Sequence, residues 1–166
     1  EKADIKGRIT AALQQPERQF FLHTCLQEVE FGPKNFGHSI SRKRIQNFFK
    51  MAGLSFEQFF GRDPSTLSLG EKRRLAFGSI LSLSPGFIIF DEPTCALDRE
   101  GVGRFMILAK ALNEAGIGIM IISHDEEIVK ALADKIIALD AFGNYRFAPR
   151  EKYFENIAHS SNILAG

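Results

Sequence analysis

Two adjacent carboxylates, Asp91 and Glu92, stand directly after the apolar run Phe87–Phe90 and just before Pro93. An uninterrupted apolar run is typical of a strand covered on both faces of a parallel sheet, and such sheets bind ligands at the carboxyl ends of their strands. A carboxylate at that end can hold a metal ion, and a second one can orient an attacking water or take its proton. The alternative is an acidic turn that caps the next helix, because Asp is common at turns.

The segment Leu67–Arg74 offers a second kind of chemistry. Ser68 and Glu71 have the spacing of a capping box, which predicts a helix that begins here. A small hydroxyl and Gly70 at a helix N-terminus also present free N–H groups and the positive end of the helix dipole to a phosphate. A capped helix and a phosphate contact both remain open on these residues alone.

The elements that must position these groups alternate between helix and strand. Apolar residues at helical spacing predict a helix over Leu75–Leu83, ahead of the Phe87 strand. Asp98 can cap the following helix, which Gly116 stops. The β-branched run Ile117–Ile122 is a second strand, so the two strands should be parallel with a right-handed crossover. The expected apolar face of the intervening helix holds Val102, Phe105, Met106, Ala109 and Leu112.

The C-terminal part continues the same alternation. Ser123 and Glu126 have capping-box spacing, which predicts that Ser123 caps a helix over Glu127–Ala133. A further strand over Ile136–Leu139 is expected to turn back into Tyr145–Phe147.

The segment from Gln15 to Thr66, which follows a strand-like stretch at Ile9–Leu13, has a different character. It has one clear helix, Arg42–Met51, many turn residues and nine of the sixteen phenylalanines. Some of these rings should form a small core, and the excess predicts an exposed apolar patch of the kind that marks an interface. They are Phe20, Phe21, Phe31, Phe36, Phe48, Phe49, Phe56, Phe59 and Phe60.

Composition sets broader bounds. The 166 residues suffice for one domain with a core, and a net charge of +1 gives no electrostatic argument for nucleic acid or for an anionic membrane surface. Cys25 and Cys95 have neither metal-ligand nor disulfide-scaffold spacing, which favours a reducing compartment and makes the cytoplasm the expected location. No apolar run approaches the roughly 20 residues that span a bilayer, so membrane contact is expected through a partner.

Taken together, the motifs resemble those of ATP-binding cassette (ABC) ATPases, in the order and at separations similar to that family's. Gln14 lies at the glutamine position of a stretch that looks like the Q-loop. The segment Glu28–Asn35 is similar to importers of the cobalt and energy-coupling-factor type, which take up vitamins or transition-metal ions. The other matches are Leu67–Arg74 to the signature sequence, Phe87–Pro93 to the Walker B strand, Ala96–Asp98 to the D-loop and Ser123–Asp125 to the switch histidine.

This resemblance implies an α/β fold: a P-loop NTPase-like, mostly parallel sheet with helices, plus an inserted helical subdomain. Residues 1–14 and 76–166 would form the RecA-like core, and residues 15–75 the helical subdomain with the signature motif. The resemblance covers the chain from Ile9 to about Phe154.

The resemblance also implies roles in ATP hydrolysis, which needs the developing phosphoryl charge neutralised and a water held in line. Asp91 would hold Mg²⁺, and Glu92 would polarise the attacking water. His124 would reach the γ-phosphate, and Gln14 would touch Mg²⁺ or the water. Isolated from the other motifs, such a histidine or glutamine is more often an ordinary turn or loop residue.

A dimer is implied by the signature helix, which in this family contacts ATP bound to a partner subunit. The partner would be a second ABC ATPase subunit, identical or paralogous, and an integral membrane component would dock on the helical subdomain. No nucleic-acid partner is expected, and the location would be the inner face of the cell membrane. The residues that would contact the partner's nucleotide are Ser68, Leu69, Gly70, Glu71 and Asp98.

The sequence also departs from the family pattern. No G-x-x-x-x-G-K-[ST] phosphate loop occurs in it, so the N-terminal portion of the fold is expected to be missing and the chain alone is not expected to hydrolyse ATP. Leu69 stands where the family prefers glycine, and its side chain restricts backbone approach to phosphate. Two alternative hypotheses are a naturally truncated, non-hydrolysing partner subunit and an ABC ATPase that acts outside transport.

Overall fold

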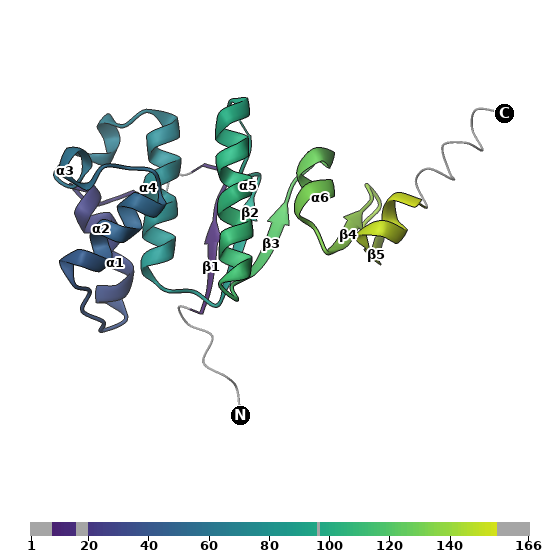
Figure 1. The fold of residues 1–166 in the computed structure, drawn as a ribbon, viewed down its shortest axis with the longest axis horizontal. Helices are drawn as coiled ribbons and strands as arrows, with labels where there is room; N and C mark the ends of the chain where they lie inside the picture. Colours follow the sequence, from purple (N-terminus) through teal and green to yellow (C-terminus); the bar gives the residue numbers. More distant parts are fainter. Residues whose placement is uncertain (1–7, 16–19, 96, 156–166) are drawn as a thin grey trace. The chain divides into compact units, whose positions relative to one another are not determined.

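The computed structural model describes residues 8–15, 20–95 and 97–155, and it divides into two compact units between Ile122 and Ser123. The first unit holds, in chain order, β1 (Ile9–Ala12), α1 (Cys25–Asn35), α2 (Arg42–Met51), α3 (Phe56–Phe59), a 3-10 turn (Pro64–Thr66), α4 (Leu69–Ser82), β2 (Phe87–Asp91), α5 (Arg99–Glu114) and β3 (Gly118–Ile122) (Figure 1). The second holds α6 (Glu126–Leu132), β4 (Lys135–Leu139) and β5 (Tyr145–Pro149).

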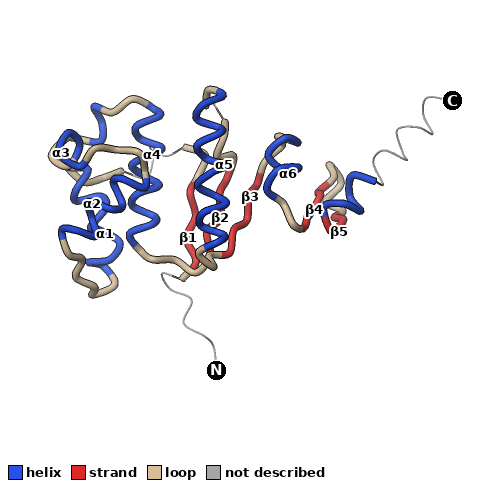
Figure 2. The backbone as a smooth tube through the Cα atoms, in the orientation of Figure 1, coloured by secondary structure: helices blue, strands red, loops and turns tan. Residues whose placement is uncertain are grey.

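A three-stranded parallel sheet, in the order β1-β2-β3, forms the centre of the first unit (Figure 2). Ile9 of β1 and Gly118 of β3 both pair in register with Phe87 of β2. A Cβ atom at Gly118 would lie only 2.4 Å from the Phe87 ring, which explains the glycine. The predicted strand–helix–strand unit with parallel strands is therefore confirmed, and so is the α/β class.

One face of this sheet is packed by α4 and α5. Phe90 stacks on Phe77 of α4, with ring centroids 5.6 Å apart, and meets Phe105 of α5 edge-on at 5.2 Å. Ile88, on the same face of β2, is completely buried. Of the predicted apolar face of α5, the residues Phe105, Ala109 and Leu112 are buried.

The helix α1 was not predicted from the sequence. Its N-terminus is closed by a capping box in which Thr24 accepts from the Gln27 N–H and the Gln27 side chain accepts from the Thr24 N–H. The buried carboxylate of Glu28 accepts the backbone N–H groups of Phe21 and Leu22 at 2.7 and 2.6 Å, which ties the preceding segment to the helix. Gly and Pro inside the segment conceal the helical pattern, because both residues normally interrupt helices.

The helix α2 has the predicted bounds, and the phenylalanines divide as expected. Phe48, Phe49, Phe56 and Phe59 are buried, and they form the core that joins α2 to α3. Phe21, Phe31, Phe36 and Phe60 remain exposed.

Helix starts show where the sequence prediction held and where it was wrong. The Ser68 box is present, and α4 begins directly after it, at Leu69. The predicted Ser123 box is absent, because Asp125 caps α6 instead: its carboxylate accepts from the Glu127 and Ile128 N–H groups. The Ser123 hydroxyl accepts from the Asp125 N–H at 3.1 Å and so forms a turn before the helix.

The second unit contains the predicted hairpin. β4 and β5 are antiparallel, with Ile137 opposite Phe147 and Leu139 opposite Tyr145. Gly143 adopts φ +84°, a conformation that glycine tolerates well, in the connecting turn.

Candidate functional site

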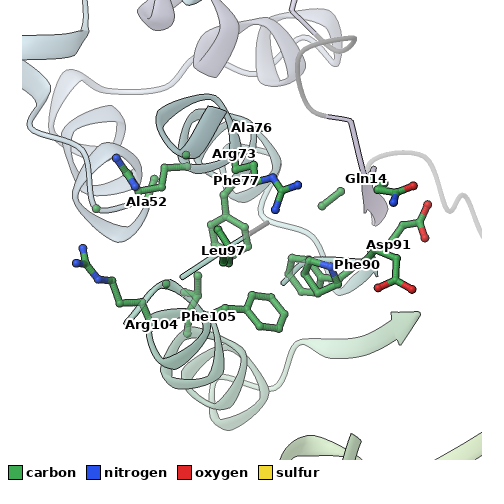
Figure 3. A pocket seen from close by; sticks show the side chains of 18 of the residues that line it. Gln14, Ala52, Arg73, Ala76, Phe77, Phe90, Asp91, Leu97, Arg104 and Phe105 are labelled. Atoms are coloured by element: carbon green, nitrogen blue, oxygen red, sulfur yellow. The ribbon is translucent and has the colours of Figure 1, made fainter. Parts of the chain in front are cut away.

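A cavity of about 490 Å³ lies in the first unit and reaches the carboxyl ends of β1 and β2 (Figure 3). Its interior is apolar, with Phe77, Phe90 and Phe105 among its lining residues. Its polar lining includes residues from four predicted site regions, namely the segment after β1, the end of β2, the start of α4 and the start of α5. The predicted site residues that line it are Gln14, Gly70, Asp91, Glu92 and Asp98.

The acidic pair sits where the central strand ends. Asp91 is the last residue of β2 and Glu92 follows it, both partly buried. The Glu92 N–H donates to the Ile122 carbonyl at 2.9 Å, which ties the end of β2 to the end of β3. Glu92 has φ +47°, in the left-handed region that a non-glycine residue rarely adopts. Such strain is concentrated at functional sites, so the backbone supports the chemical interpretation of the pair.

Gln14 reaches the same edge from the neighbouring strand. It follows the last residue of β1 by two positions, and β1 runs parallel to β2. Gln14 and Asp91 both line the cavity, and Figure 3 shows them on the same side of the view. The parallel register therefore brings together an amide and a carboxylate that are far apart in the sequence.

The start of α4 engages its polar groups in the capping box. The Ser68 N–H donates to Glu71 Oε2 at 2.8 Å, and the Glu71 N–H donates to Ser68 Oγ at 3.3 Å. The Ser68 hydroxyl also donates to Glu71 Oε2, at 2.9 Å, and the two hydrogen bonds from the Ser68 N–H and hydroxyl hold the pKa of the Glu71 carboxyl below its usual value. Gly70 lines the cavity, and the Leu69 side chain is exposed.

Asp98 caps α5 and borders the cavity at the same time. Its carboxylate accepts from the Gly101 N–H at 2.7 Å, as predicted for a helix cap. Of the predicted D-loop, Leu97 also lines the cavity, while Ala96 lies outside the described residues.

His124 belongs to the second unit. It is exposed, between the end of β3 and the start of α6. Its predicted role at the γ-phosphate stays a prediction.

Three cations that sequence reasoning did not assign to the site also line the cavity, namely Arg73 and Arg74 of α4 and Arg104 of α5. Arg73 Nη1 and Arg74 Nε are buried, and neither has a hydrogen-bond partner within the described part of the chain. Buried guanidinium atoms without partners are costly, and phosphate or carboxylate oxygens would satisfy them. The signal in the sequence for Arg73 and Arg74 was the basic run directly after the signature-like residues.

The donor set suits Mg²⁺ only in part. Mg²⁺ usually takes one or two protein carboxylates and completes its six oxygen ligands with phosphate oxygens and water. Asp91 and the Gln14 amide oxygen match that requirement at the end of the sheet. Within residues 8–15, 20–95 and 97–155, no group of three or more His, Cys, Asp or Glu side chains could hold a metal ion without such additional ligands.

Over the same described residues, no helix combines the length and the hydropathy needed to cross a bilayer.

Comparison with known proteins gives concordant matches. A family model described as ABC transporter matches residues 1–95, more than half of the chain. The EcfA2 energy-coupling factor transporter ATP-binding protein of Clostridium perfringens is 34% identical over 142 residues, covering 84% of this chain and 50% of that protein. The EcfA protein of Methanococcus maripaludis is 36% identical over 139 residues, covering 82% and 49%. The chain thus spans about half the length of these curated relatives.

Solved structures agree with this result. The structure of cbiO1 from Clostridium perfringens, described as part of the ABC transporter complex cbiONQ, matches with a TM-score of 0.74 at 30% identity. The match covers 95% of this chain and 64% of that one. The dimeric cassette MJ0796 bound to ADP and Pi matches with a TM-score of 0.75 at 31% identity, covering 86% and 63%. The chain belongs to the ABC transporter family, as part of its ATPase domain.

Proposed function

We propose that the chain forms part of the ATP-binding and ATP-hydrolysing subunit of an ABC importer, of the cobalt or energy-coupling-factor type. The observation that carries this proposal is the meeting of Gln14, Asp91 and Glu92 at one edge of a parallel sheet, with Gly70 and Asp98 lining the same cavity. The names of the relatives support the importer class, and a transition-metal ion or a vitamin is the proposed transported substrate.

The proposed chemistry divides between the residues at the strand ends. Asp91 and Gln14 would hold Mg²⁺, which, when bound, neutralises charge on the phosphate oxygens. Glu92 orients the attacking water and accepts its proton. Glu92 has a left-handed backbone conformation and lines the cavity. His124 is proposed to contact the γ-phosphate.

A second subunit is proposed to complete the site. Ser68, Leu69, Gly70 and Glu71 at the start of α4, together with Asp98, would contact ATP bound to an identical or paralogous ATPase subunit. Closing of the dimer on ATP, and its opening after hydrolysis, would then drive transport. Leu69 would weaken this contact, because its side chain stands where a closer backbone approach is needed.

Two regions of the chain are proposed to have different roles in transport. Residues 15–75 would act as the helical subdomain that meets an integral membrane component, and residues 1–14 and 76–166 as the core. The subunit would work on the cytoplasmic, inner face of the membrane and would not need nucleic acid as a partner.

Replacing Glu92 by Gln tests the catalytic assignment. The sequence has no phosphate-loop motif, so the test uses a protein in which this chain is fused to a phosphate-loop segment of an active ABC ATPase. Glu92→Gln should keep ATP binding, measured with a fluorescent nucleotide, and lower phosphate release by at least about 100-fold, since it removes the general base. Glu126→Gln, at an exposed position on α6, is the matched control and should leave both values unchanged. Normal turnover in the Glu92→Gln protein would overturn the assigned role.

The unfused chain gives a second measurement. It should neither bind nor hydrolyse ATP by itself, and ATP turnover by the unfused chain would contradict that expectation.

A further inference from the structure

The segment from Phe31 to Phe56 has a charge pattern that the proposed ATP chemistry does not use. It carries five Lys and Arg residues and no Asp or Glu, although the whole chain has a net charge of only +1. The charge is therefore concentrated on one part of the molecule. The five cations are Lys34, Arg42, Lys43, Arg44 and Lys50.

Four of these cations belong to α2, which packs against α1 and α4 (Figure 1). Arg42, Lys43, Arg44 and Lys50 are all exposed. Lys43 and Lys50 stand seven positions apart, with the exposed Asn47 between them, so they share the solvent side of the helix. The opposite side, with Ile45, Phe48 and Phe49, is buried. The cations therefore form a continuous basic surface, the α2 basic face, consisting of Arg42, Lys43, Arg44 and Lys50.

The position of this charge is unfavourable for the helix itself. The first three residues of α2 are Arg42, Lys43 and Arg44, and the first turn has no acidic residue. The positive end of the helix dipole favours acidic residues there, so three cations at this place destabilise the isolated helix. Contacts inside the fold offset part of this cost for two of the cations. Arg42 lies over the Phe56 ring, and Arg44 lies over the Phe48 ring and donates to Ser84 Oγ at 3.0 Å.

Exposed aromatic rings accompany the basic face. Phe36 follows the end of α1 and leads into the loop before Arg42, and 43% of its surface is exposed. Phe31 is 40% exposed and packs edge-on against the exposed Phe21, with ring centroids 4.7 Å apart. Lys and Arg next to exposed aromatic rings are typical of surfaces that lie on a bilayer.

We propose that the α2 basic face, together with Phe36, binds the anionic phospholipid surface of a membrane directly. A cluster of four Lys and Arg residues is within the range that recognises acidic lipid headgroups. The proposed work at the inner face of the membrane would bring such a surface close to the chain, and in this respect the inference rests on the proposed function. The net charge of the whole chain, +1, favours neither a lipid surface nor nucleic acid, so the choice of a lipid surface rests on the local cluster of cations and on the exposed Phe36. This binding is independent of the proposed ATP hydrolysis.

Vesicle co-sedimentation without nucleotide and without any membrane protein tests the proposal. The chain should bind phosphatidylcholine vesicles that contain about 30% phosphatidylglycerol, and bind pure phosphatidylcholine vesicles far more weakly. Raising the salt from about 0.1 M to about 0.5 M should release it, because the charges are exposed. The variant Arg42→Gln, Lys43→Gln, Arg44→Gln should bind the anionic vesicles about 100-fold more weakly.

Two further variants make the result specific. Lys110→Gln, Lys135→Gln, Lys152→Gln removes the same charge from other exposed positions and should keep the affinity within about threefold. Lys43→Glu, Lys50→Glu changes only the solvent side of α2 and should abolish binding, even if the first variant proves unstable by circular dichroism. Equal losses in the α2 variants and in the control would overturn the proposal. So would equal binding to neutral vesicles, or tighter binding to a mixed-sequence RNA than to anionic vesicles.

Discussion

At the scale of single residues, Glu92 combines the chemical and the conformational evidence for the site. It follows the central strand, lines the cavity and adopts φ +47°. For an L-residue that conformation costs about 1 kcal/mol relative to glycine, so the fold maintains it against local preference. The sequence could identify the carboxylate of Glu92. Its backbone conformation, however, is supported by the hydrogen bond from the Glu92 N–H to the carbonyl of Ile122 on the next strand.

Comparing glycine and alanine at position 92 measures this strain. Both substitutions remove the carboxylate and its contacts, so their difference reports the backbone alone. Glu92→Gly should have a free energy of unfolding about 1 kcal/mol higher than Glu92→Ala, because only alanine retains a Cβ atom in the left-handed region. Urea denaturation followed by circular dichroism gives both values. A more stable alanine variant would show that the backbone at Glu92 is not strained.

At the scale of elements, helix caps explain the successes and the failure of sequence reasoning. Ser68 and Asp98 cap α4 and α5 as predicted, because each is followed at the right spacing by the N–H group that it accepts. Ser123 has the same spacing to Glu126, but Asp125 lies closer to the helix and its carboxylate accepts two N–H groups. Capping-box spacing alone could not decide between two adjacent candidates for one helix end.

Substitutions at the start of α6 test which residue is the cap. Asp125→Ala should destabilise the helix by about 1 kcal/mol, because two N–H groups lose their acceptor. The amides of Glu127 and Ile128 should then exchange with solvent about fivefold faster. Ser123→Ala serves as the comparison and should have a smaller effect, since its hydroxyl accepts only the Asp125 N–H. The reverse order of effects would restore Ser123 as the cap.

The helix α1, which was not predicted, forms although its local sequence disfavours a helix. Its capping box, from Thr24 to Gln27, was present in the sequence, yet Gly32 and Pro33 argue locally against a helix. Pro33 lies near the C-terminal end of α1, where the loss of a single backbone hydrogen bond is tolerated, and its side chain is buried. Packing against α4 thus supports a helix that local preference would not predict.

At the scale of the whole molecule, each unit presents apolar surface to solvent. In the first unit, Met120 and Ile122 on the edge strand β3 are exposed. In the second, one face of the β4–β5 hairpin exposes four large apolar side chains in two facing pairs. They are Ile137 with Phe147, and Leu139 with Tyr145. Contiguous apolar surface and an open strand edge both favour association with other chains.

Self-association of the isolated chain is therefore expected. Sedimentation velocity should show species larger than the monomer at about 100 µM. Phe147→Lys, on the hairpin face, should shift the distribution toward monomer, whereas Phe142→Lys adds the same charge in the turn and should change it less. A chain that stays monomeric at that concentration would show that the exposed apolar surfaces of β3 and of the β4–β5 hairpin do not drive self-association.

The sequence by itself determined the family and the parallel strand–helix–strand unit, and it supplied the residues that are proposed to carry the chemistry. These depend on local signals: apolar runs, caps and short ordered motifs around Asp91 and Glu92. The tertiary structure decided which of these residues meet. Parallel pairing of β1 with β2 brings Gln14 to Asp91, and packing of α4 beside α5 brings Arg73 and Arg74 into the same cavity. Register and helix packing are set by contacts between residues distant in the chain, which no local pattern specifies.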